Sequence, residues 1–278
     1  MTHSTPAQML AAAAALKVDR LDAQLLLLHV LGRSSAERAW LLAHDTDPLP
    51  EAAWPAYERL CARRLTGEPV AYLVGEKEFH GLGLQVDARV LVPRPDTETL
   101  VDWALQCLEG RSAPRVLDLG TGSGAIALAI RHARPDAELT AVDASAAALG
   151  VARANAERLG LPVHFVEADW LEGAGHGFDL IVSNPPYIVA GDPHLEALCH
   201  EPQQALVSGA DGLDDIRRIV AAAPGHLAEG GWLLLEHGHD QAAAVRDLLA
   251  ARGFAEVQSR DDLAGIARCS GGIRRTVK

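Results

Sequence analysis

Hydrophobic residues along the first quarter of the chain recur with the period of an α-helix. Over residues 5–67, leucine and alanine return every three or four positions, as at Leu21 and Leu25, which places them on one face of a helix. Ser35 stands where it would cap a new helix. Breaks in the pattern fall at Gly32, Pro48 and Pro50. We therefore expect a small all-helical domain over residues 1–75.

The pattern changes between residues 76 and 95. Two short β-prone runs, 76–80 and 84–86, flank a turn that contains Gly81 and Gly83. This arrangement predicts a β-hairpin linker between two domains. An irregular connection fits runs this short nearly as well, so both interpretations stay open here.

Strands and helices alternate through the rest of the chain, residues 96–278. Asp96 stands where it would cap a helix over Thr97–Leu108. The expected strands are Arg115–Leu119, Glu138–Val142, Val163–Glu167, Phe178–Ser183 and Trp232–Glu236, with helices over Ala125–Ala133 and Ser145–Leu159. This alternation predicts an α/β domain whose mostly parallel sheet is covered on both faces.

Three more runs near the C-terminus indicate strands: Ala255–Ser259, Ile266–Cys269 and Ile273–Val277. Between the last two lies the sequence Ser270-Gly271-Gly272. Glycine pairs of this kind favour tight turns, so we expect the last two strands to form a hairpin.

Composition excludes several classes of protein. Apolar residues make up 49% of the 278 residues and charged residues 22%, which is the balance of a globular protein with a substantial core. The formal net charge of −12, without a local basic patch, disfavours direct nucleic-acid binding. No apolar run approaches the roughly 18 residues of a membrane span. The four cysteines form no CxxC pair, so we expect neither zinc nor disulfides, and a cytoplasmic location.

A glycine-rich loop follows the expected strand at Arg115–Leu119. Three glycines alternate with other residues over Gly120–Gly124, where a helix begins, and they allow a ligand to approach the backbone closely. Asp143 ends the next expected strand, where a carboxylate can accept hydrogen bonds from ribose hydroxyls. The pair indicates a nucleoside cofactor, and on this evidence alone a dinucleotide remains open.

A second motif, Asn184-Pro185-Pro186-Tyr187, follows the expected buried strand Phe178–Ser183. Prolines donate no hydrogen bond and stiffen the chain, so backbone carbonyls and the Asn184 side chain become fixed acceptors. Two such acceptors can hold both N–H groups of a planar NH2 and orient its nitrogen toward a methyl donor. A plain surface turn is the alternative, but the position at a strand end beside the glycine loop favours a site.

These two motifs together resemble the S-adenosylmethionine-dependent methyltransferases that modify planar nitrogens. Further segments make the chain similar to the peptide chain release factor glutamine methyltransferases over nearly its whole length. They are Val92–Glu98, Asp192–Leu195, Glu201-Pro202 and Leu233–Gly238. His200 departs from the resemblance, which implies an aromatic residue before Glu201.

The resemblance implies a seven-stranded, Rossmann-like class I methyltransferase domain joined to the helical domain by the hairpin. It also implies methylation of N5 of the glutamine in the Gly-Gly-Gln motif of class 1 release factors, which tunes translation termination. S-adenosylmethionine would be the methyl donor and S-adenosylhomocysteine the product. The helical domain would dock the release factor, and we expect a monomer.

Site residues follow from the same resemblance. The catalytic residues would be Asn184, Pro185 and Tyr187. The cofactor-binding residues would be Asp118, Gly120, Thr121, Gly122, Ser123, Gly124, Asp143, Asp169, Trp170 and Asn184, with Trp170 near the adenine and Asp118 near the methionine end. The substrate-binding residues would be Asn184, Pro185, Pro186, Tyr187 and Arg94. No metal is expected, because His237 and His239 lack a third ligand nearby in the sequence.

Two other functions compete with this interpretation. A nucleic-acid amino methyltransferase, acting on adenine N6 or guanine N2, would use the same Asn184–Tyr187 motif on a flipped base. The acidic charge and the lack of a basic, aromatic target domain disfavour it. A silent cofactor-binding subunit is disfavoured because both motifs are intact.

Overall fold

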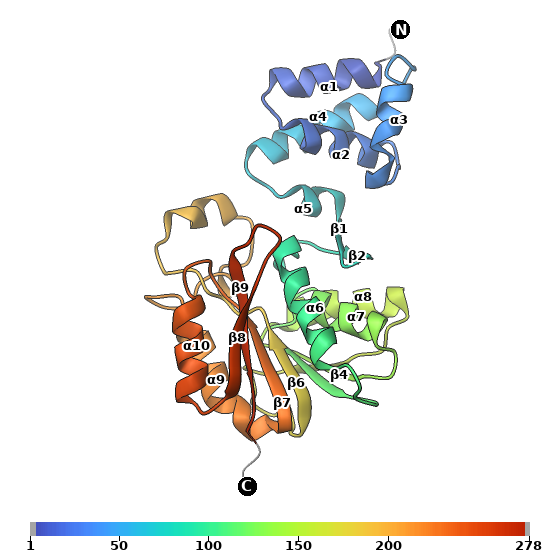
Figure 1. The fold of residues 1–278 in the computed structure, drawn as a ribbon. Coiled ribbons are helices and arrows are strands. Elements are labelled where there is room, and N and C mark those ends of the chain that lie inside the picture. The colour runs from blue at the N-terminus through green and yellow to red at the C-terminus, as the bar shows by residue number, and fades with distance from the viewer. Residues whose placement is uncertain (1–3, 276–278) are drawn as a thin grey trace. The chain divides into compact units, whose positions relative to one another are not determined.

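The computed structural model describes residues 4–275, which form two compact units. Residues up to Glu76, together with Ala197–His200, make unit 1, and Lys77–Glu196 with the residues from Glu201 onward make unit 2. Figure 1 shows the helices of the first unit and the sheet of the second. No helix among the described residues is long and apolar enough to cross a membrane.

Unit 1 is all-helical around its own core. Its helices are α1 Pro6–Ala15, α2 Arg20–Val30, α3 Arg38–Ala43, α4 Ala53–Leu65 and α5 Val70–Val74, with a 3-10 turn η1 at Ser35–Glu37. Met9, Leu26, Leu41 and Tyr57 are buried together in this core. The prediction that Ser35 is a cap is wrong, because the preceding Ser34 accepts the Ala36 N–H at 3.3 Å.

Unit 2 begins with the predicted hairpin. Strands β1 (Glu76–Phe79) and β2 (Leu82–Gln85) form a two-stranded sheet, so the hairpin is confirmed and an irregular linker is excluded. The buried Asn155 amide joins the hairpin to the glycine loop, since it pairs with the backbone of Gln85 at 2.7 and 3.0 Å and donates to the Ser123 carbonyl at 2.9 Å. The hairpin is thereby fixed beside the loop.

The main sheet of unit 2 has seven strands in the order β5-β4-β3-β6-β7-β9-β8, with β9 antiparallel to both neighbours and the other pairs parallel. This confirms the α/β fold and the seven-stranded sheet. The strands are β3 Arg115–Leu119, β4 Glu138–Asp143, β5 His164–Glu167, β6 Phe178–Ser183, β7 Leu227–Glu236, β8 Ala255–Asp261 and β9 Ala267–Ile273.

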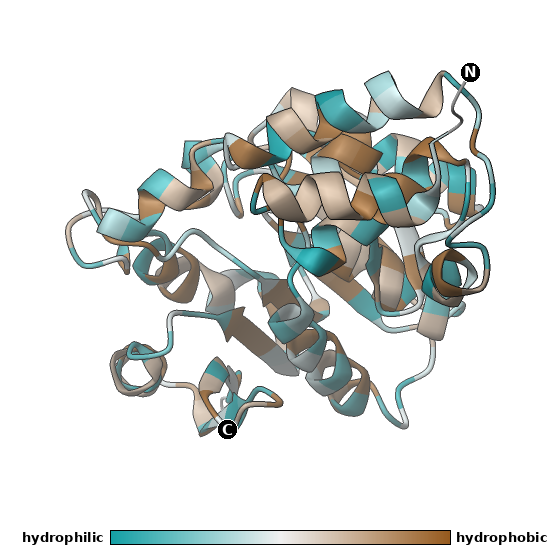
Figure 2. Ribbon diagram, turned by 90° about the horizontal axis from the view of Figure 1, so that it is seen from above, coloured by the Kyte–Doolittle hydropathy of each residue, from teal (hydrophilic) through white to brown (hydrophobic). Residues whose placement is uncertain are grey.

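Helices cover both faces of the sheet. They are α6 Glu98–Cys107, α7 Ala125–Ala133, α8 Ala146–Leu159, α9 Asp214–His226 and α10 Ala242–Ala251, with 3-10 turns η2 Pro95–Thr97, η3 Pro193–Leu198 and η4 Gln203–Ala205. One core cluster packs α6 and α7 on the sheet, and a second packs α9 and α10 on it. In Figure 2 hydrophobic and hydrophilic segments alternate along the helices. The sheet is therefore buried between two layers.

Two local predictions in unit 2 are wrong. Asp96 is inside η2 and caps nothing, because Thr97 is the residue that precedes α6. The C-terminal hairpin does not form, since residues 267–273 are one continuous strand that includes Ser270-Gly271-Gly272. The predicted strand Ile273–Val277 ends outside the described residues.

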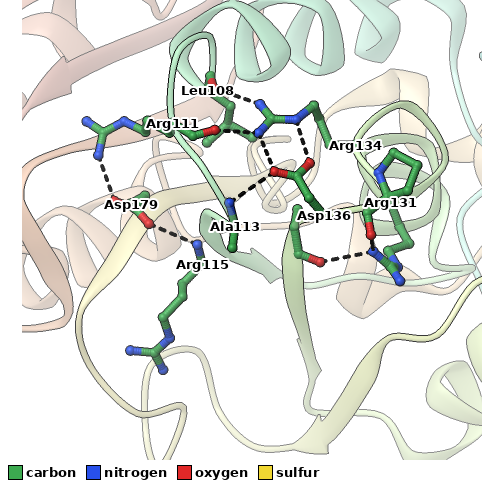
Figure 3. A network of polar contacts seen from close by, with 10 residues as sticks. Leu108, Arg111, Ala113, Arg115, Arg131, Arg134, Asp136 and Asp179 are labelled. Carbon is green, nitrogen blue, oxygen red and sulfur yellow. Dashed lines mark hydrogen bonds and ion pairs between the residues drawn. The ribbon is translucent and has the colours of Figure 1, made fainter.

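A polar network ties the amino ends of the strands together (Figure 3). The Asp179 carboxylate at the start of β6 accepts from the Arg111 guanidinium at 2.6 Å and from the Arg115 N–H at 2.9 Å. The Arg134 guanidinium donates to the carbonyl oxygens of Leu108 and Arg111, both at 2.7 Å. These contacts lie at the amino ends of the strands and therefore do not occupy the carboxyl ends, where a functional site is expected.

Candidate active site

The carboxyl ends of β3 and β6 lie side by side in the middle of the sheet. Leu119 pairs with Ser183, so the residues that follow them, Gly120 and Asn184, are neighbours. The Ser183 hydroxyl also donates to the Leu119 carbonyl at 2.8 Å. The strand order changes direction between β3 and β6, and open α/β sheets bind ligands at such a switch point.

A cleft opens at this switch point. Among the residues proposed from the sequence it is lined by Gly120, Gly122, Asp143, Asp169, Trp170, Asn184 and Pro186. The structure thus brings together residues from both motifs and from the carboxyl ends of four strands, β3, β4, β5 and β6. Asp118, Thr121, Ser123, Gly124, Pro185, Tyr187 and Arg94 do not line it.

Two glycines of the loop serve different purposes. Gly120, with a φ of +68°, packs under the Trp170 ring, where a Cβ would lie 3.3 Å from the ring. Gly122, with a φ of +55°, has no atom within 4 Å of the place a Cβ would take. Backbone at Gly122 is therefore open toward the cleft, which allows a ligand to approach it closely.

Asp143 holds the glycine loop from the end of β4. Its carboxylate accepts the N–H groups of Gly122 and Ser145, each at 2.9 Å. Burial raises the pKa of Asp143, and these two hydrogen bonds act in the opposite direction. Each oxygen keeps a further lone pair, so the carboxylate has acceptor capacity for hydroxyl groups of a ligand in the cleft.

Asp118 lies beneath the loop and not in the cleft. It is fully buried, accepts from the Thr121 hydroxyl at 2.6 Å and from the Ala127 N–H at 3.2 Å, and so joins β3 to α7. Burial raises its pKa to about 7, and nearby Asp143 adds to the rise. Its Oδ1 has no hydrogen-bond partner among the described residues, so an acceptor remains available under the glycine loop.

One wall of the cleft is aromatic and charged. The Trp170 indole N–H donates to Asp215 at 3.0 Å, and the Ser208 hydroxyl donates to the other Asp215 oxygen at 2.7 Å. Arg218 forms an ion pair with Asp169 on the same wall. These contacts fix the indole beside Gly120, and a flat ring in that position suits the base of a nucleoside.

Two further segments complete the cleft, of which the sequence singled out only Pro202, as part of the Glu201-Pro202 pair. They are Arg89–Leu91, which follow the hairpin, and Pro202, Gln204 and Ala205. Buried Glu201 joins them, because its carboxylate accepts the Val92 N–H at 3.0 Å and forms an ion pair with Arg94. The predicted substrate residue Arg94 thus lies beside the cleft and anchors this segment. His200, where the resemblance implied an aromatic residue, is part of unit 1 and contacts the Thr66 carbonyl at 3.0 Å.

The Asn184–Tyr187 segment is held at several points. Asn184 is half-buried and donates through Nδ2 to the Thr97 hydroxyl at 3.2 Å, whereas the Pro185 side chain is buried. The Tyr187 hydroxyl donates to Glu236 at 3.4 Å, and the Tyr187 carbonyl accepts from Gln241 at 3.1 Å. The segment is therefore a rigid corner in which Asn184 and Pro186 face the cleft.

The sequence reasoning did not propose Asp215 and Arg218, which line the cleft, or Glu236, which contacts the Tyr187 hydroxyl behind it. Glu236 is the most deeply buried of the three. It ends β7, is 1% exposed, and its pKa is raised to about 7, chiefly by burial. The apolar run Leu233-Leu234-Leu235 ending in a glutamate was the signal that could have identified it, since an acid at the end of a buried strand is rare without a partner. Both ring nitrogens of the adjacent His237 are in hydrogen-bond contact, one with the Gly238 carbonyl and the other with the Ser270 hydroxyl.

Comparison with known proteins gives the family. Residues 101–252 match the model of the methyltransferase small domain, and residues 7–75 match that of the PrmC N-terminal domain. A methyltransferase from Pyrococcus furiosus has a similar structure, with a TM-score of 0.53 and 20% identity over 77% of this chain and 98% of that one. A 16S rRNA guanine-N2 methyltransferase from T. thermophilus, in complex with AdoMet and guanosine, has a TM-score of 0.56 and 23% identity over 72% of this chain and 50% of that one. These two likenesses concern the fold alone.

Two curated relatives are much closer in sequence. The release factor glutamine methyltransferase of Bordetella pertussis is 56% identical over 91% of this chain and 94% of its own. That of Burkholderia pseudomallei is 50% identical over 98% of both chains. At this identity and coverage, the chain belongs to the release factor glutamine methyltransferase family.

Proposed function

We propose that this chain transfers a methyl group from S-adenosylmethionine to the side-chain nitrogen N5 of the glutamine in the Gly-Gly-Gln motif of class 1 release factors. The observation that carries the proposal is the position of Asn184, one residue beyond the Leu119–Ser183 pair, in the same cleft as Gly122 and Asp143. The acceptor corner and the cleft are thus one site.

The residues of the cleft fit the cofactor. Asp143 supplies acceptors for ribose hydroxyls, Trp170 a flat face for adenine, and Gly122 an open approach to the backbone. Asp118 offers an unpartnered oxygen under the loop, where the amino-acid end would lie. When bound, the cofactor supplies a methyl group on a positively charged sulfur.

The corner at Asn184 addresses the chemical difficulty of the reaction. The lone pair of an amide nitrogen is delocalised by the resonance that gives peptide bonds a rotation barrier of roughly 18–20 kcal/mol. Acceptors from Asn184 and the Pro185 carbonyl would hold the two N–H groups, orient the nitrogen and stabilise the positive charge that develops on it. Because the methylated, charged nitrogen loses its proton readily, this corner needs no strong base.

We further propose that the helical domain, residues 1–75, docks the release factor. Five of the eight exposed large hydrophobic residues among the described ones are in this quarter of the chain: Leu16, Leu21, Leu42, Trp54 and Leu65. Exposed apolar side chains concentrated in a domain without catalytic groups are expected for a protein-binding surface.

The proposal is tested by incubating the purified protein with S-adenosylmethionine and a class 1 release factor and analysing its tryptic peptides by mass spectrometry. We expect one methyl group on the Gly-Gly-Gln glutamine. Asn184→Ala should lower the rate of transfer by about 100-fold or more, with much less effect on the affinity for the cofactor measured by calorimetry. Methyl transfer to DNA or RNA instead would establish the amino methyltransferase alternative, and cofactor binding without transfer to any substrate would establish the silent subunit.

A further inference from the structure

Trp170 is held in a backbone conformation that its residue type disfavours. Its φ is +53°, in the left-handed region that residues other than glycine rarely adopt. The indole ring lies over Gly120, where a Cβ would be 3.3 Å from the ring. A strained conformation persists only where the surrounding structure holds it, and such positions concentrate at ligand sites. The place of this ring in the cleft therefore requires a group that fixes it.

Asp215, in the first turn of α9, is that group. Its Oδ1 accepts the indole N–H of Trp170 at 3.0 Å. Its Oδ2 accepts from the buried Ser208 hydroxyl at 2.7 Å, and the Ser208 oxygen in turn accepts the Asp215 N–H at 2.9 Å. Arg218 forms an ion pair with the same carboxylate at 3.6 Å. Both carboxylate oxygens are thus engaged by the protein, which fixes their direction.

Ser208 connects this carboxylate to the acceptor corner. Ile188, the first residue after the corner, forms a parallel bridge with Val207. The Ile188 N–H donates to the Leu206 carbonyl at 2.8 Å, and the Ile188 carbonyl accepts the Ser208 N–H at 2.9 Å. Asp215 therefore joins the aromatic wall of the cleft to the backbone directly beyond the corner.

We infer that Asp215 is a positioning residue for the cofactor, because it fixes the Trp170 indole, through its N–H, where the adenine ring would lie against it. A side chain that is ordered only on binding costs conformational entropy at that step, whereas one held beforehand does not. The inference rests on the cofactor assigned in the proposed function. An interaction of this kind is the same before and during methyl transfer, so its loss should raise the KM for S-adenosylmethionine and leave kcat nearly unchanged.

Two substitutions separate the hydrogen bond of Asp215 from its charge. Asp215→Asn keeps an oxygen that accepts the indole N–H, and its NH2 group can donate to the Ser208 oxygen. Asp215→Leu keeps the approximate shape without an acceptor, and both variants lack the negative charge. We expect Asp215→Leu to raise the Kd for S-adenosylmethionine, measured by calorimetry, about tenfold, and Asp215→Asn to stay within about twofold of the wild type.

Trp170→Phe tests whether the effect passes through the ring. Phenylalanine keeps a flat face and lacks the N–H, so in this background Asp215→Leu should change the Kd no further. Ser208→Ala is a milder change that removes the hydroxyl orienting the carboxylate. It should raise the Kd in the wild-type background but not beside Trp170→Phe. Asp214→Leu is the matched control, because Asp214 is an exposed acid in the same turn of α9 that pairs with Arg217 at 2.9 Å, and it should leave the Kd unaltered.

The possible outcomes are distinguishable, because cofactor binding is measured without a release factor. Equal Kd values for Asp215→Asn and Asp215→Leu would exclude the hydrogen bond as the cause. An effect of Asp215→Leu that persists beside Trp170→Phe would mean direct contact between Asp215 and the cofactor, and would overturn the positioning role while the proposed function stands. If the wild type binds no S-adenosylmethionine, the proposed function itself fails, and the inference with it.

Discussion

Gly212 lies where a side chain would collide with the corner formed by Asn184–Tyr187. A Cβ at this position would be 2.2 Å from the Tyr187 carbonyl oxygen and 2.6 Å from Gln241 Nε2, the two atoms that hydrogen-bond each other. We expect Gly212→Ala to displace Tyr187 and lower kcat, as well as the melting temperature. Gly160→Ala is the matched control, because Gly160 has a similar φ of +66° with nothing within 4 Å. Its cost should be about 1 kcal/mol of backbone strain, with kcat preserved.

Asp118 should make stability depend on pH. Its pKa is raised to about 7 in the folded protein, so the fold binds this proton more tightly than the unfolded chain, where aspartate titrates near 4. The resulting stabilisation is present below about pH 4 and is lost as the pH rises through about 7. Asp118→Asn should remove this contribution, which is on the order of 4 kcal/mol.

Urea unfolding of the wild type and Asp118→Asn between pH 4 and pH 8 measures this effect. As the pH rises, the wild type should lose more of its free energy of unfolding than Asp118→Asn does. Other carboxyl groups also make stability depend on pH, and those with a lowered pKa, such as Asp192 and Asp262, do so in the opposite direction. Because both proteins contain them, their contributions cancel in the difference between the two free energies of unfolding. Parallel curves across this range would contradict a raised pKa at Asp118.

At the scale of the elements, the network at the amino ends of the strands should support the fold without taking part in catalysis. Asp179→Ala removes the acceptor shared by Arg111 and the Arg115 N–H at the start of β3 (Figure 3). We expect a loss of about 1–2 kcal/mol in the free energy of unfolding, with kcat unchanged because the cleft is at the other end of the strands. Glu138→Ala removes only an exposed ion pair with Arg115 and should cost less than about 1 kcal/mol.

The alternation of apolar segments was enough to predict most elements of the sheet but not its C-terminal part. Gly271 and Gly272 were interpreted as turn residues, yet they lie within β9. A Cβ on Gly271 would be 2.5 Å from the Leu234 side chain and 3.0 Å from the Trp103 ring. These glycines allow close packing across the sheet, and that requirement comes from residues distant in the sequence.

The same limit applies to the candidate site. Gly120, Gly122, Asp143 and Asn184 follow strands directly, so a local pattern could place them at one edge of the sheet. Residues such as Asp215, Arg218 and Glu236 act through contacts with other segments. Asp215 is recognised only once Trp170 is seen to donate to it at 3.0 Å, because nothing in its sequence neighbourhood distinguishes it from an ordinary first-turn acid of a helix.

For the molecule as a whole, the notable feature is that each unit has its own core. Met9, Leu26 and Tyr57 belong to a cluster separate from the two that enclose the sheet. Unit 1 also includes Ala197–His200, from a segment far along the chain. Four residues carry no periodicity, so the sequence pattern alone could not assign them to the helical unit.

This organisation allows the proposed docking role of unit 1 to be tested without disturbing catalysis. Leu42 is 68% exposed and outside the core, so Leu42→Asp should leave the melting temperature nearly unchanged. If Leu42 contacts the release factor, the substitution places a charge in an apolar interface and should raise KM about tenfold with kcat preserved. Leu263→Asp makes the same change at a fully exposed leucine of unit 2. Steady-state kinetics with an intact release factor compare the two, and an equal effect on KM would count against a docking surface specific to the helical unit.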